Sequence, residues 1–534
     1  MTSHSVRTST ELRGDLLWRN SFDLARDAAG RYGEALAVID GDVRITFADL
    51  PRLAEQAASA LSALGLRAGG RVILWAPNSW KWIVLALAIH RLGGLVVPVN
   101  TRFRATDLAY VIRKVNPHAI MLEQGFLDAD YLGMLDEATN GMARPTTILA
   151  NESPDPRGLT WPDFIYSGKS TSLPAGDEPA GNQPADIIFT SGTTGQPRGV
   201  VATHAQVLRS FYDFGRYCDL RAGDRYAIVN PFSHSFGYRS GWIMALMFGA
   251  TVWPLATFDV PGLVRLIERE RITVLPGTPT LYQSLLTWPG LEGRDLSSLR
   301  LSWTGAMNIP PSLIEAMRTR LGFQDILTAY ALTEATAVAT LTRRGDADLV
   351  IASTSGCALP DIEVRIAEND QPLPADESGE IQIRGYNVMD CYLDDPEATA
   401  EAVSPDGWLR TGDIGALDAQ GYLSVSGRLK DMLIVGGFNV YPAEVEAVLL
   451  QHPAIADATV IGVPDERMGE VALAFVILRA GALPDEKGLI AWLRERIANF
   501  KVPRQIRFVE ELPRNSLGKV LKNELRAKSA VTDA

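Results

Sequence analysis

One polar, glycine-rich segment stands out as a place where this sequence could do chemistry. The run Asp186–Val200 reads DIIFTSGTTGQPRGV, so a short apolar strand leads into hydroxyl side chains and glycines, and then into Arg198. Glycines let a backbone approach a ligand with its N–H groups exposed, and hydroxyls and a guanidinium add further donors. This donor set is typical of a loop that binds polyphosphate. The GxxxxGK[ST] spacing of the Walker loop is absent, and a polar hairpin without a ligand is the alternative.

Three later segments carry further chemical groups. Thr328–Glu334 (TAYALTE) follows a predicted strand and places a hydroxyl beside a carboxylate, at a strand end where α/β proteins collect ligands. Trp408–Asp413 (WLRTGD) has one carboxylate after a glycine turn, and Pro513–Lys519 (PRNSLGK) puts a lysine on a glycine-containing loop. Taken singly, each has an ordinary alternative: a helix N-cap, a solvated aspartate or a surface lysine.

In this order the segments resemble the adenylate-forming superfamily, which includes acyl-CoA synthetases, luciferases and nonribosomal-peptide adenylation domains. The resemblance runs from Ile45 to Lys519. It implies an ATP- and Mg²⁺-dependent enzyme that converts a carboxylic acid to an acyl-adenylate and then passes the acyl group to coenzyme A. The usual family form has lysine at the position of Arg198, so charge is kept while geometry changes. It more often has glycine at the position of Ala331, so the acyl tunnel is expected to be narrower here.

The resemblance also implies the nucleotide site. The residues expected to bind the phosphates are Thr190, Ser191, Gly192, Thr193, Thr194, Gly195 and Arg198. Thr333 is implied to bind the α-phosphate and Glu334 to hold Mg²⁺, which typically takes one or two protein carboxylates and completes its shell with phosphate oxygens and water. Tyr330 is implied to stack on adenine, and Asp413 and Arg428 to bind the ribose.

The catalytic residue that the family match implies is Lys519, reaching both the substrate carboxylate and the α-phosphate. The acid is already ionised at neutral pH, so no general base is needed, and a cation between two anions lowers the barrier. After adenylation the small domain is implied to swing about Lys430 and withdraw Lys519. Gly436, Gly437 and Phe438 would then line the pantetheine channel, with an ordinary glycine-rich turn as the alternative.

The acid pocket is expected to be apolar. By resemblance its wall comprises His234, Phe236, Trp303, Gly305, Ala306 and Ala331, with His234 as wall or gate and not a proton carrier. The only cation in these segments is Arg239, placed at the edge, so a hydrophobic acid is favoured over a dicarboxylate or an amino acid. Stretches such as APNSWKW and GFNVYPAEVEAVL look closest to bacterial synthetases that activate the indane-ring propanoate of steroid breakdown. Medium-chain, cyclic and aromatic acids stay open.

The whole chain predicts an α/β protein. Strands at Arg71–Ala76, Leu95–Val99, Ile272–Leu275 and Leu299–Trp303 alternate with helices such as Trp80–Arg91, as in helix-covered, mostly parallel sheets. A small antiparallel β subdomain is expected at 361–385. Residues 1–429 are predicted to form this large N-terminal domain, and 430–534 a small mobile α+β domain that ends, after Lys519, in a short tail. Loops are expected at Asn151–Arg157 and Ser172–Asp186.

Charge and composition argue against several classes of protein. The net charge of -12 and the lack of a basic run argue against nucleic-acid binding. The longest uncharged stretch, Gly241–Phe258, is read as a buried helix followed by a strand, so no integral membrane segment is expected. The N-terminus lacks the apolar core of a secretory signal, and the three cysteines are expected to be reduced, which predicts a cytoplasmic protein. A homodimer is one expectation for the oligomeric state.

Three alternatives remain open from the residues. An acyl-AMP ligase that loads a carrier protein would form pyrophosphate without a CoA thioester. A luciferase-like oxygenase belongs to the same superfamily. A nucleotide-binding regulator without catalysis would release no AMP, although every expected chemical position holds a competent residue.

Overall fold

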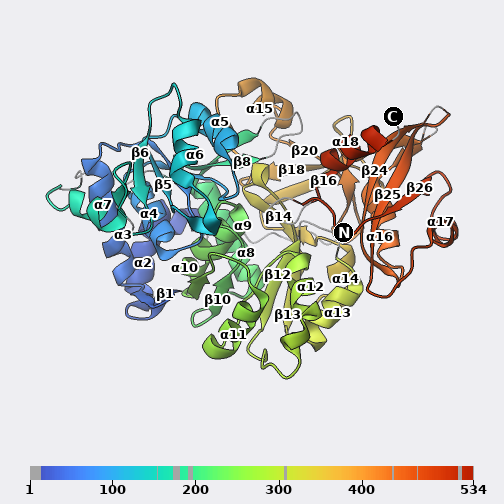
Figure 1. Cartoon of the computed structure of the whole chain (residues 1–534), viewed down its shortest axis with the longest axis horizontal. Helices are drawn as coiled ribbons and strands as arrows, with labels where there is room; N and C mark the ends of the chain where they lie inside the picture. The colour runs from blue at the N-terminus through green and yellow to red at the C-terminus, as the bar shows by residue number, and fades with distance from the viewer. Residues whose placement is uncertain are drawn as a thin grey trace, which may run out of the picture.

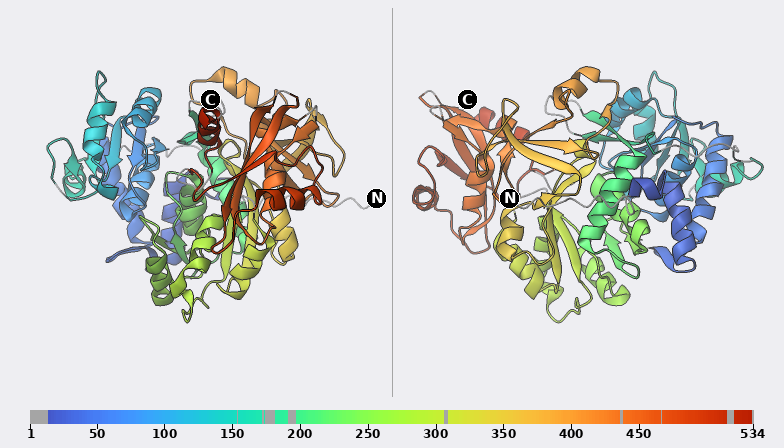
Figure 2. Two further views of the ribbon diagram at one scale, coloured as in Figure 1. Left: turned by 45° about the vertical axis from the view of Figure 1, so that its right-hand side comes forward. Right: turned by 180° about the vertical axis from the view of Figure 1, so that it is seen from behind.

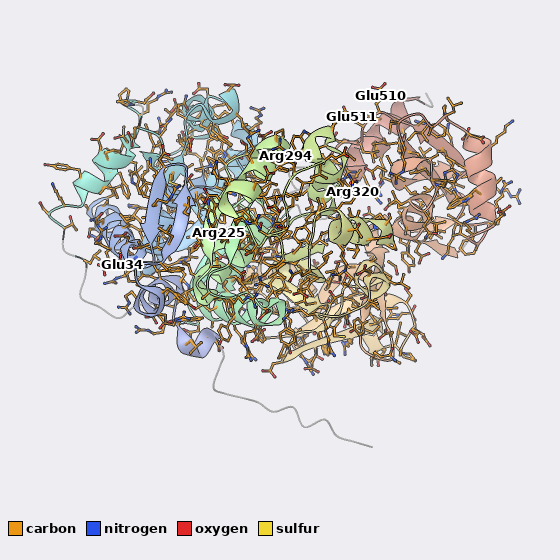
Figure 3. The ribbon with its side chains drawn as sticks, turned by 90° about the horizontal axis from the view of Figure 1, so that it is seen from below. Glu34, Arg225, Arg294, Arg320, Glu510 and Glu511 are labelled. Atoms are coloured by element: carbon orange, nitrogen blue, oxygen red, sulfur yellow. The ribbon has the colours of Figure 1, made fainter. Side chains whose placement is uncertain are left out.

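The computed structural model describes residues 14–152, 154–171, 173, 181–190, 197–305, 309–435, 438–465, 467–514 and 520–532. In Figure 1 a large blue-to-yellow region fills most of the longest axis, and an orange-to-red region lies at one end of it. The same arrangement is visible from behind in Figure 2. In the view from below (Figure 3), Arg225 lies within the large region and Glu511 on the C-terminal one. The α/β fold class is confirmed, with large N-terminal sheets and a separate C-terminal unit.

The first large sheet contains the strand that leads to the phosphate segment. Its strands, in spatial order, are β19 (Cys391–Tyr392), β9 (Arg198–Thr203), β8 (Pro184–Thr190), β4 (Leu95–Pro98), β3 (Arg71–Trp75), β5 (Ala119–Leu122), β6 (Thr146–Leu149) and β7 (Leu159–Thr160). Pairing is parallel from β8 to β7 and antiparallel at β8–β9 and β9–β19. β8 begins at Pro184, so the loop expected at Ser172–Asp186 is wrong in its last residues, and Asp186 is fully buried.

Helix α4 (Trp80–Arg91) shows how the sequence produces these elements. The Ser79 side chain accepts a hydrogen bond from the backbone N–H of Trp82 and so caps the first turn. Residues Trp82 to His90 are all buried, because α4 packs against helices α2 (Ser21–Tyr32) and α3 (Asp49–Ala63). The predicted strand–helix–strand order β3–α4–β4 is confirmed, with β3 and β4 each one residue shorter than expected.

A second large sheet region positions the other site segments. One part has the order β10 (Arg225–Ile228), β11 (Thr251–Pro254), β1 (Leu36–Asp40), β2 (Val43–Thr46), and the other β12 (Leu301–Gly305), β13 (Asp325–Leu332), β14 (Ala337–Leu341), β15 (Cys357–Ala358). The predicted strand Ile272–Leu275 is wrong as a strand, because only Val274 forms bridges, to Tyr226 and Leu301. Those two bridges join the two parts. Helix α8 (His204–Cys218) packs against β14.

The expected antiparallel subdomain is present and larger than predicted. Its order is β17 (Gln371–Pro372), β16 (Ile362–Glu368), β18 (Gly379–Gly385), β20 (Leu409–Leu417), β21 (Leu423–Arg428). Residues Asp413 and Arg428 face each other across β20 and β21. The subdomain therefore carries the predicted ribose ligands to the border of the C-terminal region.

The C-terminal region is an α+β unit with helices on both faces of one sheet. Its strands are β22 (Leu433–Val435), β23 (Phe438–Val440), β24 (Ile455–Asp465), β25 (Gly469–Leu478) and β26 (Gln505–Phe508), and its helices are α16 (Pro442–Leu449), α17 (Glu486–Arg494) and α18 (Lys522–Thr532). The short segment expected after Lys519 contains a helix that was not predicted: α18 covers the second face of the sheet and buries Leu525 against Ile461 and Phe475. The 429/430 domain boundary stays a prediction; a 3₁₀ turn at Leu429–Asp431 lies there.

Two features bear on the predicted cellular setting. Among the described helices none is long and apolar enough to cross a membrane, and the stretch after Gly241 folds as a buried π-helical turn, the short helix α10 (Met244–Phe248) and β11, as predicted. Cys218, Cys357 and Cys391 are free thiols.

A close backbone approach at Gly168, after α7 (Trp161–Ser167), gives a test of this packing. A Cβ at Gly168 would lie 2.3 Å from the backbone nitrogen of Ala60 in α3, whereas a Cβ at Gly30 in α2 would meet nothing within 4 Å. Gly168→Ala is expected to lower the free energy of unfolding by about 1–3 kcal/mol because backbone must move. Gly30→Ala is expected to raise it by about 0.5–1 kcal/mol. Urea unfolding of both variants measures this, and equal stabilities would contradict the packing.

Candidate active site

The ends of the phosphate segment are held by paired strands. Thr190, the last residue of β8, lies opposite Arg198, the first residue of β9. Tyr110 anchors the far end, because its hydroxyl donates to the carbonyl of Pro197 at 2.8 Å. The predicted ligands Ser191, Gly192, Thr193, Thr194 and Gly195 lie outside the described residues. Thr190 and Arg198 are thus brought to the two sides of the expected phosphate loop.

Glu334 joins this group from a different sheet. It lies in the 3₁₀ turn Thr333–Ala335 that follows β13. Its Oε1 accepts hydrogen bonds from the hydroxyl of Tyr392 at 3.1 Å and from the hydroxyl of Thr190 at 3.4 Å. Thr333 begins the same turn and is half-buried. Tyr392 was not predicted from the sequence, because a tyrosine in CYLDD carries no motif of its own.

The predicted adenosine ligands form one hydrogen-bonded set. The Tyr330 hydroxyl donates to Oδ2 of Asp413 at 2.6 Å, and the Arg428 guanidinium lies 2.9 Å from Oδ1. Burial, and next the Asp413 charge, raise the pKa of Tyr330, so it stays a donor. A carboxylate has about four acceptor positions. Asp413 therefore keeps capacity for two ribose hydroxyls.

Arg239 is not at the edge of the acid pocket, as the sequence suggested. Its side chain is fully buried and forms an ion pair with the fully buried Asp186, including a hydrogen bond from Nε to Oδ2 of 3.2 Å. The reason is topological: Asp186 lies inside β8, where its charge requires a partner. The cation is therefore neutralised within the protein, and the pocket segment offers less positive charge than expected.

His234 and Phe236 form the turn before this buried arginine. The Nδ1 of His234 accepts from the backbone N–H of Phe236 at 3.2 Å. Burial, assisted by the charge of Arg239, lowers the pKa of His234 to about 4. The imidazole is neutral at pH 7 and therefore adds no positive charge to the expected pocket wall.

The other pocket candidates lie on neighbouring strands β12 and β13. Trp303 is buried against Phe214 of α8 and Tyr226 of β10, with ring centroids 5.5 Å away in both cases. Gly305 is a glycine for a structural reason as well, because a Cβ there would lie 2.8 Å from the carbonyl oxygen of Ala329. Ala331 is exposed at an irregularity in the β13–β14 pairing. Ala306 lies outside the described residues.

The two sides of the expected pocket are linked through hydrogen bonds. The Tyr226 hydroxyl, which lies beside Trp303, donates to the carbonyl of Ser240 at 3.1 Å. The Ser240 hydroxyl in turn donates to the carbonyl of Phe236 at 2.7 Å. The wall candidates on β12 and those at His234–Phe236 are therefore parts of one packed region.

Most residues expected to act in acyl transfer lie outside the described residues. Lys519, Gly436 and Gly437 lie outside the described residues, and Phe438 is described only as the first residue of β23. Across the described ranges, no group of three or more His, Cys, Asp or Glu side chains could hold a metal ion. A single carboxylate such as Glu334 suits Mg²⁺, which takes most of its ligands from phosphate and water. The donors on Glu334 are neutral hydroxyls, so its charge remains available.

Comparison with known proteins places these residues in a family. The AMP-binding enzyme family matches residues 25–393, and the AMP-binding enzyme C-terminal domain matches residues 444–519. The chain belongs to the AMP-binding enzyme family.

Individual relatives narrow the class. The chain is 44% identical over 507 residues (93% of this chain, 96% of the relative) to a 3-[(3aS,4S,7aS)-7a-methyl-1,5-dioxo-octahydro-1H-inden-4-yl]propanoyl:CoA ligase of Rhodococcus jostii. It is 46% identical over 493 residues (92% and 95%) to the protein of the same description in Mycobacterium tuberculosis. A solved structure of the anthranilate CoA ligase AuaEII with anthranoyl-AMP is similar at a TM-score of 0.88, with 27% identity and coverage of 97% and 98%.

The protein is an acyl-CoA ligase, an enzyme that joins an acid to a thiol. ATP, Mg²⁺ and coenzyme A are its cofactor and co-substrates, and its partners are small molecules. Loading of a carrier protein is not favoured, because the relatives that match over nearly the whole chain are CoA ligases.

The buried His90 beneath β8 predicts a pH-dependent stability. Its Nε2 lies 3.0 Å from the carbonyl of Ala185, and burial lowers its pKa from 6.5 to about 4. Between these pH values the unfolded chain binds a proton that the folded chain does not. The free energy of unfolding should therefore fall as pH drops from 6.5 towards 4, by up to about 1.4 kcal/mol per pH unit from this group.

Urea unfolding at pH 8 and pH 5 measures this effect. His90→Gln is expected to be less stable at pH 8 but to lose less stability on acidification than the unmodified protein. The same loss on acidification in both proteins would contradict the assignment to His90.

Proposed function

We propose that the acid activated by this ligase is a bulky alicyclic propanoate of the steroid-derived kind. The observation that carries the proposal is the 44% identity over 507 residues to a ligase whose described product is a dioxo-octahydro-indenyl propanoyl thioester. The neutral His234, the ion-paired Arg239 and the buried Trp303 support it, because they leave a wall without free charge. A medium-chain acid is the second candidate.

We propose the following roles for the chain's own residues. Lys519 lies between the acid carboxylate and the α-phosphate and stabilises the charge that develops there. A carboxylate oxygen bonds to the α-phosphorus and pyrophosphate leaves. Thr333 binds the α-phosphate, and Glu334 would hold Mg²⁺, which neutralises phosphate charge. The described contacts of Glu334 and of Asp413 support these positions.

The second half-reaction needs a different face of the C-terminal domain. The domain turns about Lys430, so that Lys519 leaves and Gly436, Gly437 and Phe438 line the pantetheine channel. The CoA thiolate then bonds to the acyl carbon, and AMP leaves. We further propose a cytoplasmic location and residues 430–534 as the mobile domain; a homodimer stays a prediction.

A panel of acids tests the function. Pyrophosphate release and AMP release are measured with ATP and Mg²⁺, each with and without CoA, for the unmodified protein and for Lys519→Ala. A bulky alicyclic propanoate is expected to give CoA-dependent AMP release that Lys519→Ala lowers at least about 100-fold, since the lysine supplies transition-state stabilisation. Turnover of medium-chain acids alone would overturn the acid class, and pyrophosphate without a CoA thioester would overturn the CoA ligase.

The indole of Trp303 gives a sharper test of the acid. Its Nε1 is buried and has no hydrogen-bond partner in the described part of the chain. Buried donors generally have a partner, which makes this indole a candidate donor to the bound acid. If a ring carbonyl of the acid accepts this hydrogen bond, Trp303→Phe should lower kcat/KM about 10- to 100-fold for the oxo acid, and much less for the same ring system without oxygens.

Trp253→Phe is the matched control. Trp253 lies on β11 with an indole nitrogen that is likewise buried and without a described partner. This variant should change kcat/KM by the same factor for the oxo acid and for the ring system without oxygens. If Trp303→Phe also changes kcat/KM equally for the two acids, the indole of Trp303 does not donate to a ring carbonyl of the acid. The proposed recognition of the oxo group is then wrong.

A further inference from the structure

A tyrosine that carries no motif lies at the centre of the phosphate and metal site. Tyr392 is only 7% exposed. Its hydroxyl donates to Oε1 of Glu334, and the guanidinium carbon of Arg198 lies 5.2 Å from the centroid of its ring. One side chain therefore contacts both the carboxylate expected to hold Mg²⁺ and the cation expected to bind phosphate.

The backbone around Tyr392 is held at both ends. Tyr392 pairs with Val200 of β9, and the next residue donates its N–H to the carbonyl of Gly199 at 2.7 Å. The N–H of Tyr392 itself donates to the hydroxyl of Thr399 at 3.0 Å. β19 is thus attached to the strand that begins with Arg198. A shift of the β19 backbone relative to β9 would break these contacts.

The hydroxyl contact restricts how Glu334 can be used. Tyr392 and Thr190 both donate to Oε1, and the carboxylate is held by its backbone too, because the Glu334 carbonyl accepts from the N–H of Met389 at 2.8 Å. Two neutral donors on one oxygen orient the carboxylate without cancelling its charge. The other oxygen, Oε2, stays available for a cation.

The ring contact suits the arginine that this chain has in place of the usual lysine. A planar guanidinium can stack on an aromatic face and still direct N–H donors to a phosphate, whereas an ammonium is a point charge on a flexible stem. The Tyr392 ring therefore limits the rotamers of Arg198.

We propose that Tyr392 is a positioning residue for nucleotide activation: its hydroxyl orients Glu334 towards the metal, and its ring orients Arg198 towards the phosphates. This inference rests on the proposed roles of Glu334 and Arg198.

The hydroxyl contact with Glu334 and the ring contact with Arg198 can be tested separately. Titration calorimetry measures the affinity for ATP with Mg²⁺ and with EDTA, in both cases without an acid. Tyr392→Phe keeps the ring and removes the hydroxyl. It should weaken Mg-ATP binding about 10-fold, the usual cost of losing a partner of a metal ligand, while binding of ATP in EDTA changes less than about twofold. Tyr392→Leu removes the ring as well and should weaken ATP binding in EDTA too, because Arg198 loses its support.

The chain offers a close control in Tyr386. Its hydroxyl donates to a carboxylate oxygen of Asp213 at 3.0 Å, and the guanidinium carbon of Arg209 lies 3.7 Å from its ring centroid. The same three types of side chain are thus assembled away from the expected ligands. Tyr386→Phe should lower the melting temperature about as much as Tyr392→Phe does, but leave the ratio of the two ATP affinities unchanged.

The outcomes are distinguishable. If the unmodified protein binds no Mg-ATP, the proposed function itself fails. If it binds Mg-ATP and the affinity ratio of Tyr392→Phe equals that of Tyr386→Phe, the role of Tyr392 is purely structural and only this inference is overturned. A loss confined to the Mg²⁺-dependent affinity supports it.

Discussion

The attachment of β8 to its sheet is the constraint on which the site depends. β8 joins its parallel neighbour β4 through one residue pair, Val96 with Asp186. The Asp186 side chain forms the fully buried ion pair with Arg239, in the π-helical turn after the acid-pocket segment. Removing one partner of such a pair leaves an uncompensated buried charge and costs about 3–5 kcal/mol. Asp186 therefore links the strand that leads to the phosphate segment with the turn that follows the acid-pocket segment.

The site itself is made where three chain segments meet. β8 and β9 supply Thr190 and Arg198, the turn after β13 supplies Glu334, and β19 supplies Tyr392. Each segment is attached to a sheet by backbone hydrogen bonds, so the side chains are placed on rigid elements. The adenosine side is built in the same way, since Tyr330 of β13 contacts Asp413 of β20. This construction keeps the charged groups in position before a ligand binds, which reduces the reorganisation that phosphate chemistry requires.

Most of the secondary structure was predictable because helices and strands depend on local sequence patterns. The capped α4 and the strands on either side of it follow from Ser79 and from apolar runs of strand length. The failures have physical causes. Ile272–Leu275 is apolar enough for a strand, yet only Val274 pairs with the neighbouring strands, through single bridges to Tyr226 and Leu301. No helix was predicted after Lys519, but α18 forms there and is stabilised by packing of Leu525 on the C-terminal sheet.

The sequence by itself determined the family, the reaction class and the order of the nucleotide motifs, because glycines, hydroxyls and charges at set spacings form local signatures. Only the tertiary structure decided the partners of those residues. Arg239, which the sequence suggested at a pocket edge, forms a buried ion pair with Asp186, 53 residues away in the chain. Tyr392 contacts Glu334, which is 58 residues away in the chain. Such contacts depend on strand pairing and burial between distant segments, and no local pattern encodes which tyrosine or arginine will meet which carboxylate.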